Sequence, residues 1–174
     1  MKDNISFILS RRSIRKYQQK TVEQDKVKKL IRAAMAAPSA GNQQPWHFVV
    51  ITERDTLDRL AKKHPYGKML HEAPLCIAVC GEPETSKRDV FWVQDCSAAM
   101  QNLLLAADSL GLGAVWLGIH PSEELKKSVN DALELPEYIS PMGLASIGYP
   151  AEIKQPNCRY DEAKIHYERF CVDR

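Results

Sequence analysis

The segment RRSIRKY, residues 11–17, carries four cationic side chains and a serine within seven residues. Arginine side chains bind a phosphate dianion through paired, charge-assisted hydrogen bonds, and the hydroxyl group of Ser13 can add a further donor. The same cations would also suit the end of a short helix, where positive charge complements the helix dipole. The residues alone therefore leave two interpretations open, a phosphate-binding segment and a solvated basic turn.

A second segment with chemical potential is APSAGNQQPWHFVVI, residues 37–51. Small and amide side chains, among them Ser39 and Asn42, follow Pro38 and precede an apolar run. Backbone that such residues leave exposed can present donors and acceptors to a flat heteroaromatic ring. An ordinary polar loop would have the same composition, so this alternative also stays open.

The sequence lacks the motifs of enzymes that carry their own nucleophile or phosphate loop. It contains no G-x-S-x-G, G-x-x-x-x-G-K or H-E-x-x-H motif, and no G-x-G-x-x-G motif follows the first predicted strand. Its five histidines show no ligand spacing, and its five cysteines include no C-x-x-C pair. We therefore predict neither a metal site nor a catalytic side chain. An enzyme of this kind leaves the difficult chemistry to a cofactor.

Length and composition favour a single globular domain over residues 1–174. Hydrophobic residues make up 44% and charged residues 26% of the chain, an ordinary balance for a folded protein. The formal net charge of +2 cannot supply the many phosphate contacts of nucleic-acid binding. No apolar run reaches the ~18 residues of a membrane span, and no secretory signal precedes the basic segment. Together with the odd number of cysteines, this predicts a reduced, cytoplasmic protein without nucleic-acid or membrane partners.

Hydrophobic periodicity predicts that helices and strands alternate around the two segments. A short helix, capped by Asp3 or Asn4, is expected before RRSIRKY with Ile5, Ile8 and Leu9 on its apolar face. Because helices and strands alternate along the rest of the chain as well, the economical fold is a central sheet with helices on both sides.

The later elements follow from the same patterns. A helix is expected to open at Thr21, with Gln24 completing a capping box, and is followed by a strand at 48–52 and a helix over 52–64. Next come a strand at 75–80 that is buried on both faces and a helix over 91–110. The last elements are a strand at 114–119, a helix capped by Ser122 and a strand at 143–149.

Four segments, in their order along the chain, resemble the FMN-dependent nitroreductase family. They are RRSIRKY, APSAGNQQPWHFVV, AAMQNLLLAADSLGLGAVWLG (98–118) and IGYPAEIKQPNCRY (147–160). The likeness spans nearly the whole chain, which is similar to the short members of that family. It implies an α+β fold, a three-layer α/β/α sandwich with a mixed central sheet, and a homodimer that holds FMN at the subunit interface.

The resemblance also implies which residues contact the FMN phosphate and its ring. Arg11, Ser13 and Arg159 match positions that hold the phosphate, and Arg12 adds backbone or side-chain contacts. Arg15 matches the cation beside the N1/O2 edge of the flavin.

Two further groups of residues match positions around the flavin ring. Pro38, Ser39 and Asn42 match the loop that the partner subunit lays against the ring. Leu117 and Gly118 match the backbone near flavin N5. Because the larger enzymes often have a glutamate and a proline in this region, the contact here is expected to be through the main chain.

Other positions are matched more loosely. Lys68, in YGKML, is expected to reach the pyrimidine edge of the flavin. Asn157 stands where some members have a second late basic residue, so phosphate affinity should rest more on Arg11 and Arg159.

The walls of the site are the least defined by sequence. Phe91, Trp92 and Trp116 are candidates for an aromatic wall, although aromatic side chains on a helix also serve as plain core.

The activity that the resemblance implies is the reduction of nitroaromatics, quinones or related small-molecule acceptors by NADH or NADPH. Hydride would pass through flavin N5 in a ping-pong cycle, and Arg15 would stabilise negative charge at the N1/O2 edge. Narrower flavoenzymes of the same fold stay open as alternatives, namely dehalogenases, enone or aldehyde reductases and flavin-fragmenting enzymes. So does a flavin-binding protein without turnover.

Overall fold

The computed structural model describes residues 5–83, 90–157 and 159–170, so the predicted caps Asp3 and Asn4 lie outside the described residues. No helix in these three stretches is both long and apolar enough to span a membrane. The helices are α1 (Ser6–Ser10), α2 (Gln24–Met35), α3 (Arg54–Lys63), α4 (Trp92–Ser109) and α5 (Glu123–Leu133), with short 3-10 helices η1 (Ala40–Asn42), η2 (Lys68–His71) and η4 (Glu162–Lys164). The strands are β1 (Trp46–Ile51), β2 (Leu75–Gly81), β3 (Gly113–Gly118) and β4 (Ser140–Gly148).

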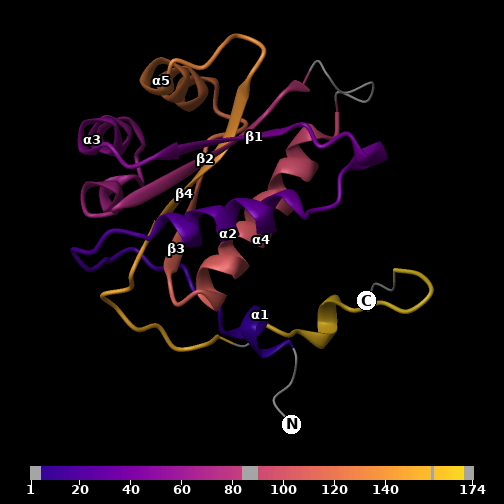
Figure 1. Ribbon diagram of the computed structural model, residues 1–174. Coiled ribbons are helices and arrows are strands. Elements are labelled where there is room, and N and C mark those ends of the chain that lie inside the picture. The colour runs from indigo at the N-terminus through magenta and orange to yellow at the C-terminus, as the bar shows by residue number, and fades with distance from the viewer. Residues whose placement is uncertain (1–4, 84–89, 158, 171–174) are drawn as a thin grey trace.

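A four-stranded sheet in the order β1-β2-β4-β3 forms the middle layer (Figure 1). The two central strands, β2 and β4, are buried at every residue. This confirms the prediction that the apolar run LCIAVC lies inside the sheet, since only a strand covered on both faces is apolar throughout.

Helices cover both faces of the sheet. Figure 1 shows α3 and α5 on one side and α2 and α4 on the other. Successive side chains of β2 serve the two faces in turn: Ile77 and Val79 pack in the cluster that contains α2 and α4, whereas Cys76 and Ala78 pack in the cluster that contains α3 and α5. The predicted three-layer α/β/α sandwich is therefore confirmed.

The sheet differs from the expectation in its strand directions. All three pairings between its four strands are antiparallel. Among the described residues, the parallel component of the expected mixed sheet is limited to an isolated bridge between Ser13 and Ala114, outside the strands themselves.

The start of α2 also differs from the prediction. The helix begins at Gln24, its N-cap is Glu23, and no side chain makes a capping hydrogen bond, so the predicted capping box at Thr21 is wrong. The Glu23 carboxylate instead accepts a hydrogen bond of 2.7 Å from the hydroxyl group of Tyr149. Val22 packs against the core. These two contacts hold the chain extended up to Glu23. The predicted cap of α5 is confirmed, because Ser122 Oγ accepts from the Leu125 N–H at 3.3 Å.

The short N-terminal helix is present, but its apolar side chains are not covered. Ile5, Ile8 and Leu9 are 49%, 47% and 60% exposed. Figure 1 shows α1 and the C-terminal segment together at one end of the molecule, away from α3 and α5.

Gly113 at the start of β3 allows the N-terminal segment to approach the sheet. A Cβ atom at this position would lie 2.6 Å from Ile14 Cβ, so Gly113→Ala must displace Ile14. We expect the variant to lose about 1–3 kcal/mol of unfolding free energy through overpacking. Urea unfolding measures this loss.

A matched control exists at the other end of the same strand. A Cβ atom at Gly118 would meet nothing within 4 Å, so Gly118→Ala should unfold at nearly the same urea concentration as the wild type. Equal stability of the two alanine variants would contradict the close packing of Ile14.

Candidate functional site

The segment RRSIRKY lies along the outer edge of β3. The Ile14 N–H donates to the Ala114 carbonyl at 3.0 Å, next to the bridge between Ser13 and Ala114. Ile14 is buried in the core, and Ser13 and Arg15 on either side point the opposite way, as neighbours in an extended segment do. The strand-like backbone therefore explains why an isoleucine stands among the cations.

Tyr17 fastens the end of this segment. Its hydroxyl group lies 2.8 Å from the Ile14 carbonyl oxygen and 3.0 Å from the Ser146 carbonyl oxygen. Burial raises the pKa of the Tyr17 phenol well above its usual value, so the group stays a neutral donor. The hydrogen-bonded ring anchors the segment to β4.

Residues that follow β4 lie over the same segment. Arg12 Nε donates to the Gln155 carbonyl at 2.7 Å, and Lys154 Nζ donates to the Ser13 carbonyl at 2.7 Å. These two hydrogen bonds join the segment RRSIRKY to the segment that follows β4.

The carboxylate of Glu152 makes a further contact between the two segments. Its Oε1 accepts from the Arg15 N–H at 2.7 Å and lies 3.2 Å from Lys154 Nζ. The pKa of the Glu152 carboxyl group is lowered mainly by the hydrogen bond from the Arg15 backbone, and to a smaller extent by the hydrogen bond from Lys154. The carboxylate thus holds the backbone of Arg15 and leaves its guanidinium group available for a ligand.

A basic cavity of about 390 Å³ lies between the two segments. Arg12 Nη2 is buried and has no hydrogen-bond partner among the described residues. A buried donor without a partner is unfavourable, and this guanidinium group adds positive charge beside the cavity. The residues that line the cavity and carry cationic or hydroxyl groups are Arg11, Arg12, Ser13, Arg15, Lys154 and Arg159.

A second cavity of about 380 Å³ adjoins the first through a shared residue, Arg15. Trp116, Leu117 and Gly118 of β3 form one wall, and the segment around Tyr66 forms the other. The structure therefore places a strongly basic space beside a mostly apolar one, with one guanidinium group between them. A ligand with a phosphate at one end and a flat ring at the other suits this arrangement.

The loop with Pro38, Ser39 and Asn42 does not join these cavities. It precedes β1, whereas RRSIRKY lies beyond β3, so three strand spacings, about 14 Å in all, separate the two edges. Figure 1 shows the purple turn before β1 and the indigo segment after α1 on opposite sides of the molecule. Asp95 holds the loop in place, because its Oδ1 accepts from the Ala40 N–H at 3.0 Å.

Two other predicted positions are also outside the cavities. Lys68 is exposed at the start of η2 and lines neither cavity. Of the three aromatic candidates, Trp116 lines the apolar cavity, whereas Trp92 is a core residue whose ring lies edge-on to His120. Phe91 is the N-cap of α4 and is 39% exposed.

Sequence reasoning missed several residues at the site. Glu152 and Lys154 stand in the segment IGYPAEIKQPNCRY, but no spacing relates them to RRSIRKY. His64 and Tyr66 lie directly after α3, and an isolated histidine gives no signal of its position.

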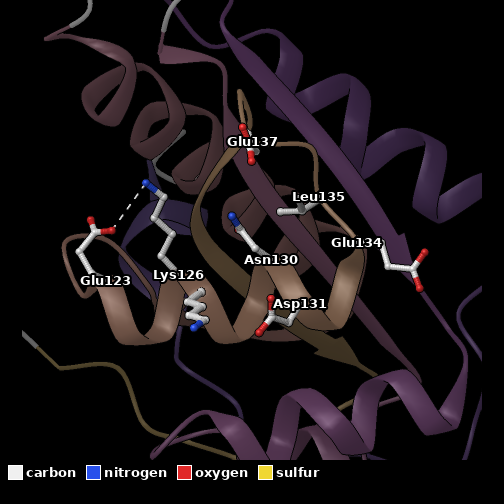
Figure 2. Close-up of a pocket in the computed structure, with 8 residues that line it drawn as sticks. Glu123, Lys126, Asn130, Asp131, Glu134, Leu135 and Glu137 are labelled. Carbon is white, nitrogen blue, oxygen red and sulfur yellow. Dashed lines mark ion pairs between the residues drawn. The ribbon is translucent and has the colours of Figure 1, made fainter.

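A separate hollow beside α5 lacks the features of such a site. Figure 2 shows its lining, in which Lys126 and Glu123 form an ion pair of 3.8 Å and Glu134 points away from them. The side chains are mostly charged and of both signs. They form a solvated surface and do not converge on one ligand group.

The layered fold and the basic cavity beside an apolar one define a class of protein, an α/β/α sandwich suited to a phosphorylated planar ligand. A model of the nitroreductase family matches residues 8–64 and 61–149. The chain belongs to the nitroreductase family.

Individual relatives agree with this assignment. A protein of Methanothermobacter thermautotrophicus, provisionally named NADH dehydrogenase/NAD(P)H nitroreductase, is 44% identical over 97% of this chain and 88% of its own length. A crystal structure with the same provisional name from Bacteroides thetaiotaomicron is similar with a TM-score of 0.92 and 45% identity, and covers 95% of this chain and 97% of that one. A provisionally named nitroreductase from Desulfovibrio desulfuricans, crystallised in complex with FMN, is similar with a TM-score of 0.84 and 32% identity, covering 99% and 100% of the two chains.

Proposed function

We propose that the chain is an FMN-dependent oxidoreductase that uses NADH or NADPH to reduce nitroaromatics, quinones or related acceptors. The observation that carries the proposal is the position of Arg15 between a cationic cavity and an apolar one. The cationic and hydroxyl side chains that line the basic cavity support an anionic group there. FMN has the required phosphate and planar ring, so the residues present fit this cofactor.

Each group of residues would serve a different part of the cofactor. Arg11, Arg12, Ser13 and Arg159 would hold the phosphate, and Lys154, which lines the same cavity, adds positive charge. These contacts orient the ligand before any reaction.

The remaining contacts are at the ring end. Arg15 would lie at the N1/O2 edge, and the main chain of Leu117 and Gly118 would lie near N5. When bound, FMN supplies two-electron transfer between the nicotinamide donor and the acceptor. The fixed charge of Arg15 would stabilise negative charge at the ring, and the apolar wall around Trp116 would exclude water.

We further propose a homodimer in which the loop of Pro38, Ser39 and Asn42 completes the site of the partner subunit. The loop lines neither cavity of its own chain. Large apolar side chains are exposed on both terminal segments, which supports an interface there. They are Ile5, Phe7, Ile8 and Leu9 near the N-terminus and Tyr160, Ile165, Tyr167 and Phe170 near the C-terminus.

We also propose that the protein is cytoplasmic, and its free thiols support a reducing location. Cys76, Cys80 and Cys96 are free and buried, and burial raises the pKa of both Cys80 and Cys96 to about 12. These thiols therefore behave as small apolar groups of the core.

We expect the purified protein to be yellow, with about one FMN per subunit, and to sediment at about twice 19.7 kDa. NADH or NADPH should bleach the flavin, and a quinone or nitroaromatic should restore its colour with parallel-line kinetics. Visible absorption under anaerobic conditions measures both steps.

The same experiment distinguishes the alternatives. Protein that takes up no FMN would remove the proposal. Flavin that is reduced but not reoxidised by these acceptors would indicate a narrower enzyme of the same fold. Flavin that neither nucleotide reduces would indicate a binding protein without turnover.

A further inference from the structure

His64, the residue that follows α3, is almost completely buried, with 5% of its surface exposed. Its Nε2 lies 2.8 Å from the carbonyl oxygen of Gly118, and its Nδ1 lies 3.1 Å from the backbone nitrogen of Tyr66. A carbonyl oxygen can only accept a hydrogen bond and a backbone N–H can only donate one. The two contacts therefore define a neutral imidazole with its proton on Nε2.

The two partners of His64 belong to different elements that line the apolar cavity, and these elements form two of its walls. Gly118 is the last residue of β3, and Tyr66 lies in the turn that follows α3. Both line the cavity that also contains Arg15. A neutral imidazole has one donor and one acceptor, and here each is used to hold a different wall.

The turn after His64 is built to keep this geometry. The Gly67 N–H donates to the His64 carbonyl oxygen at 2.9 Å, so the chain folds back on the histidine. A Cβ atom at Gly67 would lie 2.9 Å from His64 Cβ, which only glycine avoids. The ring is thus fixed from its own backbone as well as through both nitrogen atoms.

We propose that His64 is a positioning residue that sets the spacing between the Gly118 main chain and the Tyr66 turn, and with it the width of the site for the flavin ring. This inference rests on the proposed function, because the ring is the part of FMN assigned to this cavity. His64 also lines the cavity, but both of its ring nitrogen atoms are occupied by backbone groups. It acts through the Gly118 backbone, which is exposed to the cavity.

The test compares two replacements of nearly equal length, His64→Gln and His64→Met. A glutamine amide has a donor and an acceptor and can keep both walls in place, whereas methionine fills the space without either group. We expect His64→Met to weaken FMN and riboflavin by the same factor, about tenfold. His64→Gln should stay within about threefold of the wild type for both ligands. Fluorescence titration of the flavin-free proteins measures all these affinities.

Equal affinities for the glutamine and methionine variants would overturn the proposal, as would a loss of FMN affinity without a loss of riboflavin affinity. His71→Phe is the control, because His71 contacts Asp58 at the surface and lines neither cavity. It should leave both titrations unchanged. Wild-type protein that binds neither ligand would remove the proposed function itself, so the two failures are distinguishable.

A measurement on the wild type needs no variant to fold. Nitrogen-15 spectra of the histidine side chains should show a neutral His64 ring with its proton on Nε2. The amide of Tyr66, although it lies in a turn, should exchange slowly because His64 Nδ1 accepts its hydrogen bond. A proton on Nδ1, or fast exchange of the Tyr66 amide, would contradict the two-wall geometry.

Discussion

Replacing Arg11 by alanine is expected to weaken FMN binding by roughly ten- to a hundredfold, because charge-assisted hydrogen bonds to a phosphate contribute about 1.5–3 kcal/mol each. Riboflavin has no phosphate, so its affinity should be almost the same for the variant and the wild type. Arg11 lines the basic cavity and does not line the apolar one. Fluorescence titration with both ligands measures the difference.

Arg15 provides the comparison, because it lines both cavities. A cation beside the pyrimidine edge favours the more negative, reduced cofactor, so Arg15→Ala should lower the midpoint potential of the bound flavin. Arg15→Lys should restore much of it. If Arg11→Ala and Arg15→Ala weaken FMN alike and leave the potential unchanged, both arginines bind phosphate and the assignment of Arg15 to the ring is wrong.

A hybrid dimer should recover one tight site from two defective chains. Asn42→Asp keeps the size of the side chain and tolerates the left-handed backbone at this position, where φ is +55°. In the proposed dimer it would remove an amide donor from the ring site of the partner. We expect both homodimers, Arg11→Ala and Asn42→Asp, to bind FMN at least about tenfold more weakly than the wild type.

The hybrid distinguishes a shared site from a site within one chain. The Asn42→Asp chain contributes an intact Arg11, and the Arg11→Ala chain contributes an intact Asn42, so one complete site forms if the loop serves the partner. Two affinity tags isolate the hybrid, and FMN titration counts its tight sites. No tight site in the hybrid would place the loop and RRSIRKY around the same chain's cofactor, although the loop lines neither cavity of its own chain.

Much of the fold could be predicted from the sequence because its signals are local. The run LCIAVC is apolar at every position, and a chain of that composition is stable only between two layers. The start of α2 could not be predicted, because Thr21 and Gln24 form a capping box only when the helix begins there. A hydrogen bond from Tyr149 to Glu23, far apart in the sequence, decides otherwise.

The candidate site divides in the same way. The residue types of RRSIRKY indicate anion binding directly. The structure brings Arg11, Arg12, Ser13, Arg15 and Arg159 together around one cavity. Lys154 and His64 gave no such signal. Their importance depends on what they reach across the fold, namely the carbonyl oxygens of Ser13 and Gly118.

The sharing of Arg15 by both cavities has a thermodynamic consequence. A cofactor that is oxidised or reduced while bound forms a closed cycle with its free forms, so the shift in its potential on binding is proportional to the logarithm of the ratio of the two affinities. The backbone hydrogen bond from Ile14 to Ala114 holds the segment RRSIRKY on β3. Displacement of the whole segment would move Arg11 and Arg15 together, and would therefore change affinity and potential together. Arg11, which lines the basic cavity alone of the two, would be the position from which affinity can be changed without the potential. On the proposed assignment, the residue that sets how tightly the cofactor is held and the residue that sets how readily it accepts electrons would lie only a few positions apart in the chain.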